Sequence, residues 1–146
     1  MPRLTFPIAA DGLVVSTVIC LESPAMQALQ AQGKPLPLPI SVRGMLDSGT
    51  TVTGVVPRLL IALGAVPGAS SRTQTAAGPA AVRFYRISFT IHNPASGSTV
   101  QLARRSWLVT SLPNDLPDMD VLFGMDLLHE LILTVDGPAG FFTLDF

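Results

Sequence analysis

The sequence predicts an all-β fold, mostly strands with two or three short helices, because short β-branched and aromatic runs recur between Gly, Pro, Asn and Asp. The 146 residues have the length of one ordinary domain, and a hydrophobic content of 48% is enough to fill one core. The chain contains no internal repeat and no low-complexity tract. We therefore expect residues 1–146 to fold as a single domain.

The chain is expected to open as a β-hairpin. Residues 4–8 and 13–21 are the first two apolar runs, and Asp11-Gly12 between them favours a tight turn. The later runs with strand character are residues 40–46, 73–75, 81–91, 100–110, 120–124 and two segments within 132–146. The runs 73–75 and 81–91 flank four small residues, so they predict a long hairpin with a flexible tip.

Short helices are predicted where start and stop signals enclose good helix formers. Residues 25–32 follow Ser23, the expected N-cap, and a proline, and a glycine ends them. Residues 57–63 begin with a proline and also end at a glycine. A third short helix is expected from residue 125 to about residue 131.

Composition argues against several classes of partner. Charged residues make up 13% of the chain and the formal net charge is −1, so no strong field attracts nucleic acid or an anionic membrane. Residues 1–10 lack an apolar stretch of signal-peptide length, and no later run approaches the ~20 apolar residues of a membrane span. Cys20 is the only cysteine, which fits a reducing compartment. These observations predict a cytoplasmic protein.

The candidate site begins at Asp47, which follows the apolar end of the expected strand 40–46. Ser48, Gly49 and Thr50 come next. Glycine lets the backbone turn sharply, and the hydroxyl groups can donate hydrogen bonds to a carboxylate. Taken alone, Asp-Ser-Gly is equally typical of an ordinary surface turn.

A second motif far along the chain makes the interpretation of the Asp47 segment more specific. Residues 121–128 read Val-Leu-Phe-Gly-Met-Asp-Leu-Leu. This run, together with Asp-Ser-Gly, resembles the retropepsins, the retroviral type of aspartic protease, and is most similar to their bacterial single-domain members. The order of elements is also similar, from the Asp loop through a short helix and a flap hairpin to the apolar-apolar-Gly run. The resemblance covers nearly the whole chain. It implies a retropepsin-like acid protease fold, a closed or partly open barrel that forms one half of a pepsin-type dimer.

The resemblance also implies an activity, the water-mediated hydrolysis of peptide bonds in a peptide or protein substrate. Aspartic proteases place two carboxylates around one water, because two like charges at short range share a proton. Only one Asp-Ser-Gly occurs here, so the second carboxylate would be Asp47 of the other subunit of a homodimer. No cofactor and no metal are implied.

The resemblance also implies which residues support Asp47, because their positions match those of the motifs of this family. They are Ser48, Gly49 and Thr50 around the acid, Ala76, Ala77 and Gly78 at the tip of the flap, and Leu122, Phe123 and Gly124 beneath the catalytic loop. Thr50 looks like the hydroxyl residue of pepsin-type enzymes that donates to the catalytic carboxylate, which implies activity displaced toward acid pH. Core packing explains Leu122 and Phe123 equally well.

Two departures from the retroviral pattern stand out. Thr51 and Met125 occupy positions where retroviral enzymes commonly carry an acid and an arginine that pair near the dimer interface. The segment 22–39 is also longer than the tight turn of those enzymes. The dimer therefore needs contacts other than the retroviral ion pair.

Two other readings of the site stay open. A non-catalytic dimeric peptide-binding module of the same fold would keep the Asp loop for structural reasons. A hydrolase with Ser48 as nucleophile would need a positioned histidine. His92 and His129 fall in an expected turn and a short helix, with no spacing typical of metal ligands.

Overall fold

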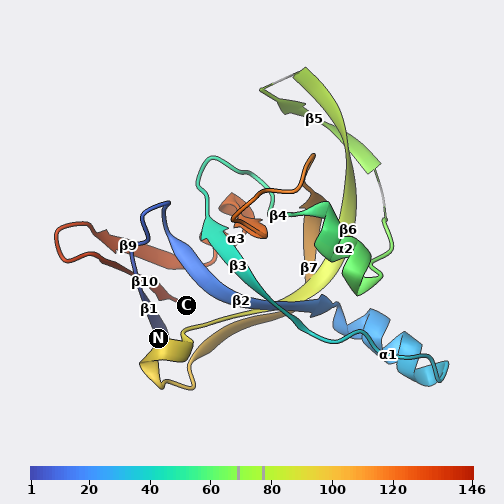
Figure 1. Ribbon diagram of the computed structural model, residues 1–146, viewed down its shortest axis with the longest axis horizontal. Coiled ribbons are helices and arrows are strands. Elements are labelled where there is room, and N and C mark those ends of the chain that lie inside the picture. Colours follow the sequence, from blue (N-terminus) through green and yellow to red (C-terminus); the bar gives the residue numbers. More distant parts are fainter. Residues whose placement is uncertain (69, 77) are drawn as a thin grey trace.

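Strands dominate the computed structural model of the chain, which describes residues 1–68, 70–76 and 78–146 (Figure 1). The strands are β1 (Arg3–Pro7), β2 (Val14–Leu21), β3 (Ile40–Leu46), β4 (Gly54–Val55), β5 (Ser70–Thr75), β6 (Gly78–His92), β7 (Gln101–Ser111), β8 (Val121–Phe123), β9 (Ile132–Asp136) and β10 (Phe141–Asp145). The helices are α1 (Ser23–Ala31), α2 (Pro57–Leu63), α3 (Met125–Leu128) and the short 3₁₀ helix η1 (Pro94–Ser96). The prediction of a mostly β chain with two or three short helices is confirmed, and the α-helices number three.

Six strands close into a barrel in the order β2-β3-β8-β4-β7-β6, and β6 pairs back to β2. The pairs β3–β8 and β4–β7 are parallel, whereas the other pairs of the ring are antiparallel. The ring closes through short pairings, because β4 pairs with β7 only at residues 110–111 and β8 pairs with β3 only at residues 44–46. β5 pairs with β6 outside the ring, and Figure 1 shows this hairpin arching away from the barrel.

The barrel interior is filled by alternate side chains of its strands, as period-2 patterning requires. In β2, for example, Val15, Thr17, Ile19 and Leu21 are buried while Ser16 is exposed. Across the core, the rings of Phe89 and Phe123 have centroids 5.1 Å apart, and Trp107 packs edge-on against Phe89 at 5.8 Å. The core therefore extends to β8, the strand that runs beside the Asp47 loop.

The first strand does not form the expected hairpin with the second. Instead β1 pairs antiparallel with β10, which continues to β9 in a separate three-stranded sheet. Pairing with β10 buries Leu4 and Phe6, and Phe6 stacks on Phe142 with ring centroids 5.4 Å apart. The turn at residues 9–12 closes only one isolated bridge. The apolar burial against the C-terminal strand thus outweighs the local turn signal.

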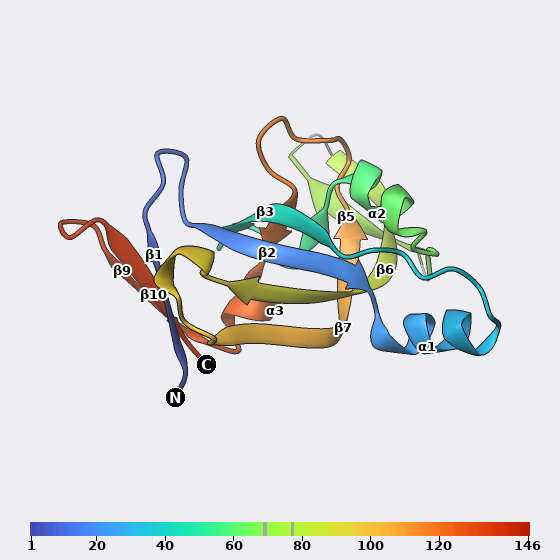
Figure 2. The same ribbon diagram turned by 60° about the horizontal axis from the view of Figure 1, so that its bottom comes forward.

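The helices match their predicted positions with small differences. α1 begins at Ser23 and not after it, and its N-cap Glu22 makes no side-chain capping hydrogen bond. The expected Ser23 cap is therefore wrong. α2 ends at Gly64, which adopts the left-handed conformation with φ of 67°. Figure 2 shows α1 projecting beyond the end of β2, and none of its residues is fully buried. No helix in the described ranges has the length and apolar character needed to cross a bilayer.

Candidate active site

Asp47 lies directly after β3, in a loop that holds its carboxylate by local hydrogen bonds. The Gly49 N–H donates to Oδ1 at 2.9 Å, and the Thr50 hydroxyl donates to Oδ2 at 2.7 Å. The Asp47 N–H donates to the Phe123 carbonyl oxygen at 2.9 Å, which ties the loop to the end of β8. Both oxygens of this half-buried acid therefore have a donor within the loop, so the loop itself sets the orientation of the carboxylate.

The loop is held from the other side by the segment after β8. The Met125 N–H donates to the Thr50 carbonyl oxygen at 2.7 Å, and the Asp126 N–H donates to the Thr51 carbonyl oxygen at 3.1 Å. Main-chain hydrogen bonds, and not side chains of Thr51 and Met125, thus join these two segments. The close approach depends on Gly124, as a Cβ there would lie 2.6 Å from the Thr50 carbonyl oxygen.

A buried polar network beneath the loop was not predicted from the sequence. Thr53 is fully buried and donates its hydroxyl to Asp126 Oδ1 at 2.8 Å and its N–H to both carboxylate oxygens at 3.1 Å. The Trp107 indole N–H donates to Asp126 Oδ2 at 3.1 Å, and the Gly124 N–H donates to the Thr53 hydroxyl at 3.3 Å. The network links β7, the end of the Asp47 loop and the first turn of α3. The only sequence signal for it is an acid two residues after the glycine of the apolar-apolar-Gly run.

The predicted site residues fall into two groups. The structure brings Ser48, Gly49, Thr50, Phe123 and Gly124 together around Asp47, and it places Leu122 beside them on β8. Two of the predicted flap residues, Ala76 and Gly78, lie at the tip of the β5–β6 hairpin, far along that arm from the barrel ring (Figure 1). Ala76 is exposed there and Gly78 begins β6, whereas Ala77 lies outside the described residues.

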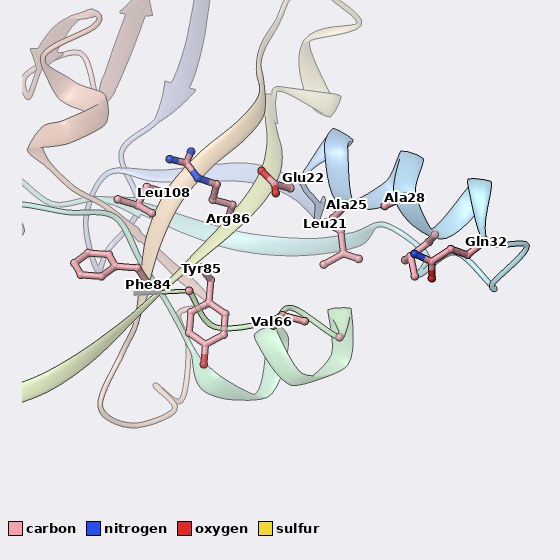
Figure 3. Close-up of a pocket in the computed structure, with 13 residues that line it drawn as sticks. Leu21, Glu22, Ala25, Ala28, Gln32, Val66, Phe84, Tyr85, Arg86 and Leu108 are labelled. Carbon is pink, nitrogen blue, oxygen red and sulfur yellow. The ribbon is translucent and has the colours of Figure 1, made fainter. Parts of the chain in front are cut away.

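A groove of about 740 Å³ lies between α1 and the segment that follows α2 (Figure 3). Its walls include neither the Asp47 loop nor the residues of β8. It is therefore separate from the candidate active site.

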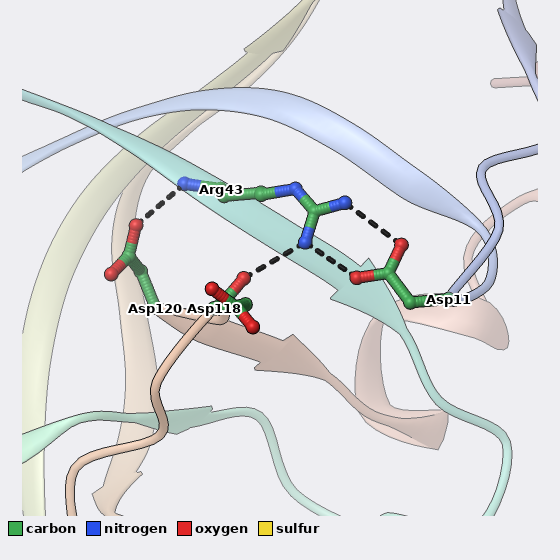
Figure 4. A network of polar contacts seen from close by, with 4 residues as sticks. All are labelled: Asp11, Arg43, Asp118 and Asp120. Atoms are coloured by element: carbon green, nitrogen blue, oxygen red, sulfur yellow. Dashed lines mark hydrogen bonds and ion pairs between the residues drawn. The ribbon is translucent and has the colours of Figure 1, made fainter.

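Arg43 organises a polar network on β3, four residues before Asp47 (Figure 4). Its guanidinium donates to both carboxylate oxygens of Asp11, at 2.6 and 2.8 Å, and to the Asp118 carbonyl oxygen at 2.8 Å. Its backbone N–H donates to Asp120 Oδ2 at 2.8 Å. The hydrogen bonds from Arg43 lower the pKa of the Asp11 carboxyl below its usual value. The network connects the turn before β2 and the loop before β8 to the strand that carries the acid.

Comparison with solved structures identifies the fold. The chain is similar to the crystal structure of a retropepsin-like aspartic protease from Rickettsia conorii, with a TM-score of 0.56 and 13% sequence identity over 99% of this chain and 90% of that one. The retroviral protease-like domain of Ddi1 from Leishmania major aligns with a TM-score of 0.38 and 15% identity, over 85% of this chain and 82% of that domain. No family model and no curated protein sequence matches the chain.

The closed barrel with its outer hairpin thus has a retropepsin-like fold. The resemblance stated from the sequence and the predicted fold class are confirmed at the level of the fold. Among the described residues, no cluster of three or more His, Cys, Asp or Glu has the arrangement of a metal site.

Proposed function

We propose that residues 1–146 form one aspartic endopeptidase domain that acts as a homodimer, with Asp47 of each subunit as the catalytic acid. The observation that carries the proposal is the carboxylate of Asp47, held at both oxygens by the Gly49 N–H and the Thr50 hydroxyl within a retropepsin-like fold. In the described part of the chain, Asp47 hydrogen-bonds to its own loop and to Phe123, and not to a second carboxylate. The proposed chemistry needs two carboxylates, so the second one would come from another subunit.

The proposed reaction runs through a water held between the two Asp47 carboxylates, which share one proton. The ionised carboxylate takes a proton from this water as its oxygen attacks the scissile carbonyl carbon. The protonated carboxyl of the other subunit donates to the carbonyl oxygen, which gives a tetrahedral diol. Return of a proton to the amide nitrogen breaks the C–N bond and releases the two peptide products.

Supporting roles follow from position. Ser48 is exposed beside the acid and its hydroxyl has no hydrogen-bond partner within the described ranges, so it is available to bond across the two-fold axis. The β5–β6 hairpin is proposed as the flap that covers a bound peptide, with Ala76, Ala77 and Gly78 as its proposed substrate-binding residues. Leu122, Phe123 and Gly124 support the acid loop.

A cytoplasmic location is proposed with this function, in keeping with the free thiol of Cys20.

The decisive experiment compares cleavage of casein by the purified protein and by Asp47→Asn. Asparagine keeps the shape of the side chain but cannot act as a base, so we expect the rate to fall about 10²–10⁴-fold. Equal residual activity in the two proteins would refute the protease. A dimer that binds peptides without cleaving them would instead support the binding module of the same fold.

Subunit mixing tests whether the site needs two chains. If Asp47→Asn is refolded together with an equal amount of the active protein, only pure active dimers retain both acids. Activity should then fall to about a quarter of that of the unmixed active protein, whereas a site within one chain would leave about half.

A further inference from the structure

The groove between α1 and the segment that follows α2 has the dimensions of a ligand-binding site. Its volume of about 740 Å³ falls in the range of pockets that hold small organic molecules or short peptide segments. In Figure 3, α1 forms one wall and the segment after α2 with Val66 forms the opposite wall, while Tyr85 and Arg86 of β6 also line the groove. The segment 22–39, which is longer than in retroviral enzymes, therefore builds one side of the groove.

The walls of the groove expose apolar side chains that the described residues leave uncovered. Val66 is 81% exposed and Leu108 is 40% exposed, although both line it. Ala25 and Ala28 face the groove from α1, a helix of nine residues that contains no fully buried side chain. A helix this short depends on packing for its stability, so an apolar occupant would complete the contacts of α1.

Polar groups lie at both ends of the groove, and their charges balance. At one end Glu22 accepts a hydrogen bond from the Ser106 hydroxyl at 2.6 Å, and Arg86 donates to the same hydroxyl at 3.4 Å. Gln32, at the other end of α1, adds an uncharged amide. This arrangement offers donors and acceptors without net charge, which matches a peptide main chain. An anionic amphiphile would place its head group beside the Glu22 carboxylate.

We propose that this groove is a second peptide-binding site, which takes a short uncharged apolar segment of a protein. The nine residues of α1 span about 13 Å, room for about four extended residues. The groove borders the base of the β5–β6 hairpin, where the Gly68 N–H donates to the Phe84 carbonyl oxygen at 2.8 Å. Building on the proposed function, the segment belongs to a protein substrate whose scissile bond lies in the Asp47 site.

Binding is measured first, because it does not depend on catalysis. The probe is a fluorescein-labelled, C-terminally amidated peptide of Leu, Val and Ala, titrated into the full chain carrying Asp47→Asn and followed by fluorescence anisotropy. Val66→Arg places a charge in the groove and should weaken binding at least about tenfold. The matched control is Ile61→Arg, since Ile61 is 78% exposed on α2 and does not line the groove.

Three results would overturn the inference. They are no binding of the peptide, equal binding by Val66→Arg and Ile61→Arg, or tighter binding of dodecanoate than of the peptide at the same groove. Ala28→Arg, from the opposite wall, should reproduce the loss seen with Val66→Arg, with Ala31→Arg on the same helix as its control.

An activity measurement then tests the link to the substrate. Val66→Arg in the active protein should raise KM for casein several-fold and leave kcat/KM unchanged for a short peptide that fills only the Asp47 site. Equal effects on both substrates would refute the substrate role. Peptide binding by a protein that cleaves nothing would leave the groove as a site and refute only the proposed protease.

Discussion

The α-carbon of Gly124 lies so close to Thr50 that a Cβ at this position would stand 2.6 Å from the Thr50 carbonyl oxygen. Thr50 is also the residue whose hydroxyl donates to Asp47 at 2.7 Å. The contact is between backbones, so no side-chain rotation relieves it. The position of the acid loop therefore depends on the missing side chain 74 residues further along the chain.

Gly124→Ala should displace the Asp47 loop and lower the free energy of unfolding by about 1–3 kcal/mol, the usual cost of forcing extra volume into a packed site. Urea denaturation measures this loss, and the rate of casein cleavage reports the displacement of the acid. Gly137→Ala is the control, because a Cβ there meets no atom within 4 Å. Unchanged stability and cleavage in Gly124→Ala would show that the loop does not rely on this contact.

Thr50→Ala removes the hydroxyl that donates to Asp47 Oδ2, whereas Thr50→Ser keeps it. The hydroxyl holds one oxygen of the carboxylate in place, so its loss should lower kcat about tenfold, whereas Thr50→Ser should keep most of the activity. Steady-state kinetics with one peptide substrate makes the comparison. Equal kcat values for Thr50→Ala and the unmodified protein would contradict the role of Thr50.

Thr53→Val preserves the shape of a fully buried side chain while deleting its hydroxyl. Asp126 then loses one donor and the Gly124 N–H loses its acceptor. An unsatisfied buried group costs about 1–3 kcal/mol, and we expect a loss of that size in the free energy of unfolding. Thr134→Val, at an exposed position of β9, should change stability little. A similar small effect of both substitutions would remove the structural role of the network.

Asp11→Asn should flatten the acid side of the pH–stability curve. Arg43 lowers the pKa of Asp11 in the folded chain, so this pair stabilises the fold above the usual carboxyl pKa, and the stabilisation disappears as the pH falls through the lowered value. The fall in Tm between pH 6 and pH 3 should be smaller in the variant.

The pair is exposed, so 0.5 M salt should reduce the difference between the variant and the unmodified protein. Asp118→Asn serves as the control, because only the backbone carbonyl of Asp118 bonds to Arg43. The same fall in Tm for Asp11→Asn and the unmodified protein would show that this ion pair does not contribute.

Local signals predicted most elements of the chain. Strand β3 and helix α2 begin and end at the predicted residues, since a β-branched run or an N-terminal proline with a closing glycine marks them directly. The two-residue strand β4 escaped prediction, because nothing in so short a segment distinguishes it from a loop. The pairing of β1 with β10 was missed for another reason: it joins the two ends of the chain, and only burial of both apolar faces selects it.

In the candidate site, too, local motifs were predicted and contacts between distant segments were missed. Asp47 and its loop were predicted because the motif is local, and Gly124 because its run is specific. The partnership of Thr53 with Asp126 crosses 73 residues, so no spacing in the sequence reveals it. The groove beside α1 was equally invisible, because its walls come from four separate segments.

β6 is one uninterrupted strand of 15 residues whose neighbours change along its length. Residues 78–83 pair with β5, the section from Phe84 onward pairs with β7, and β2 joins only at Ile87. The hairpin arm and the barrel wall thus share one strand. Residues 78–86 have a single paired neighbour, first β5 and then β7, whereas β2 is a second neighbour from Ile87 to His92. Substitutions in β2 that weaken this second pairing should therefore increase the motion of the whole hairpin arm.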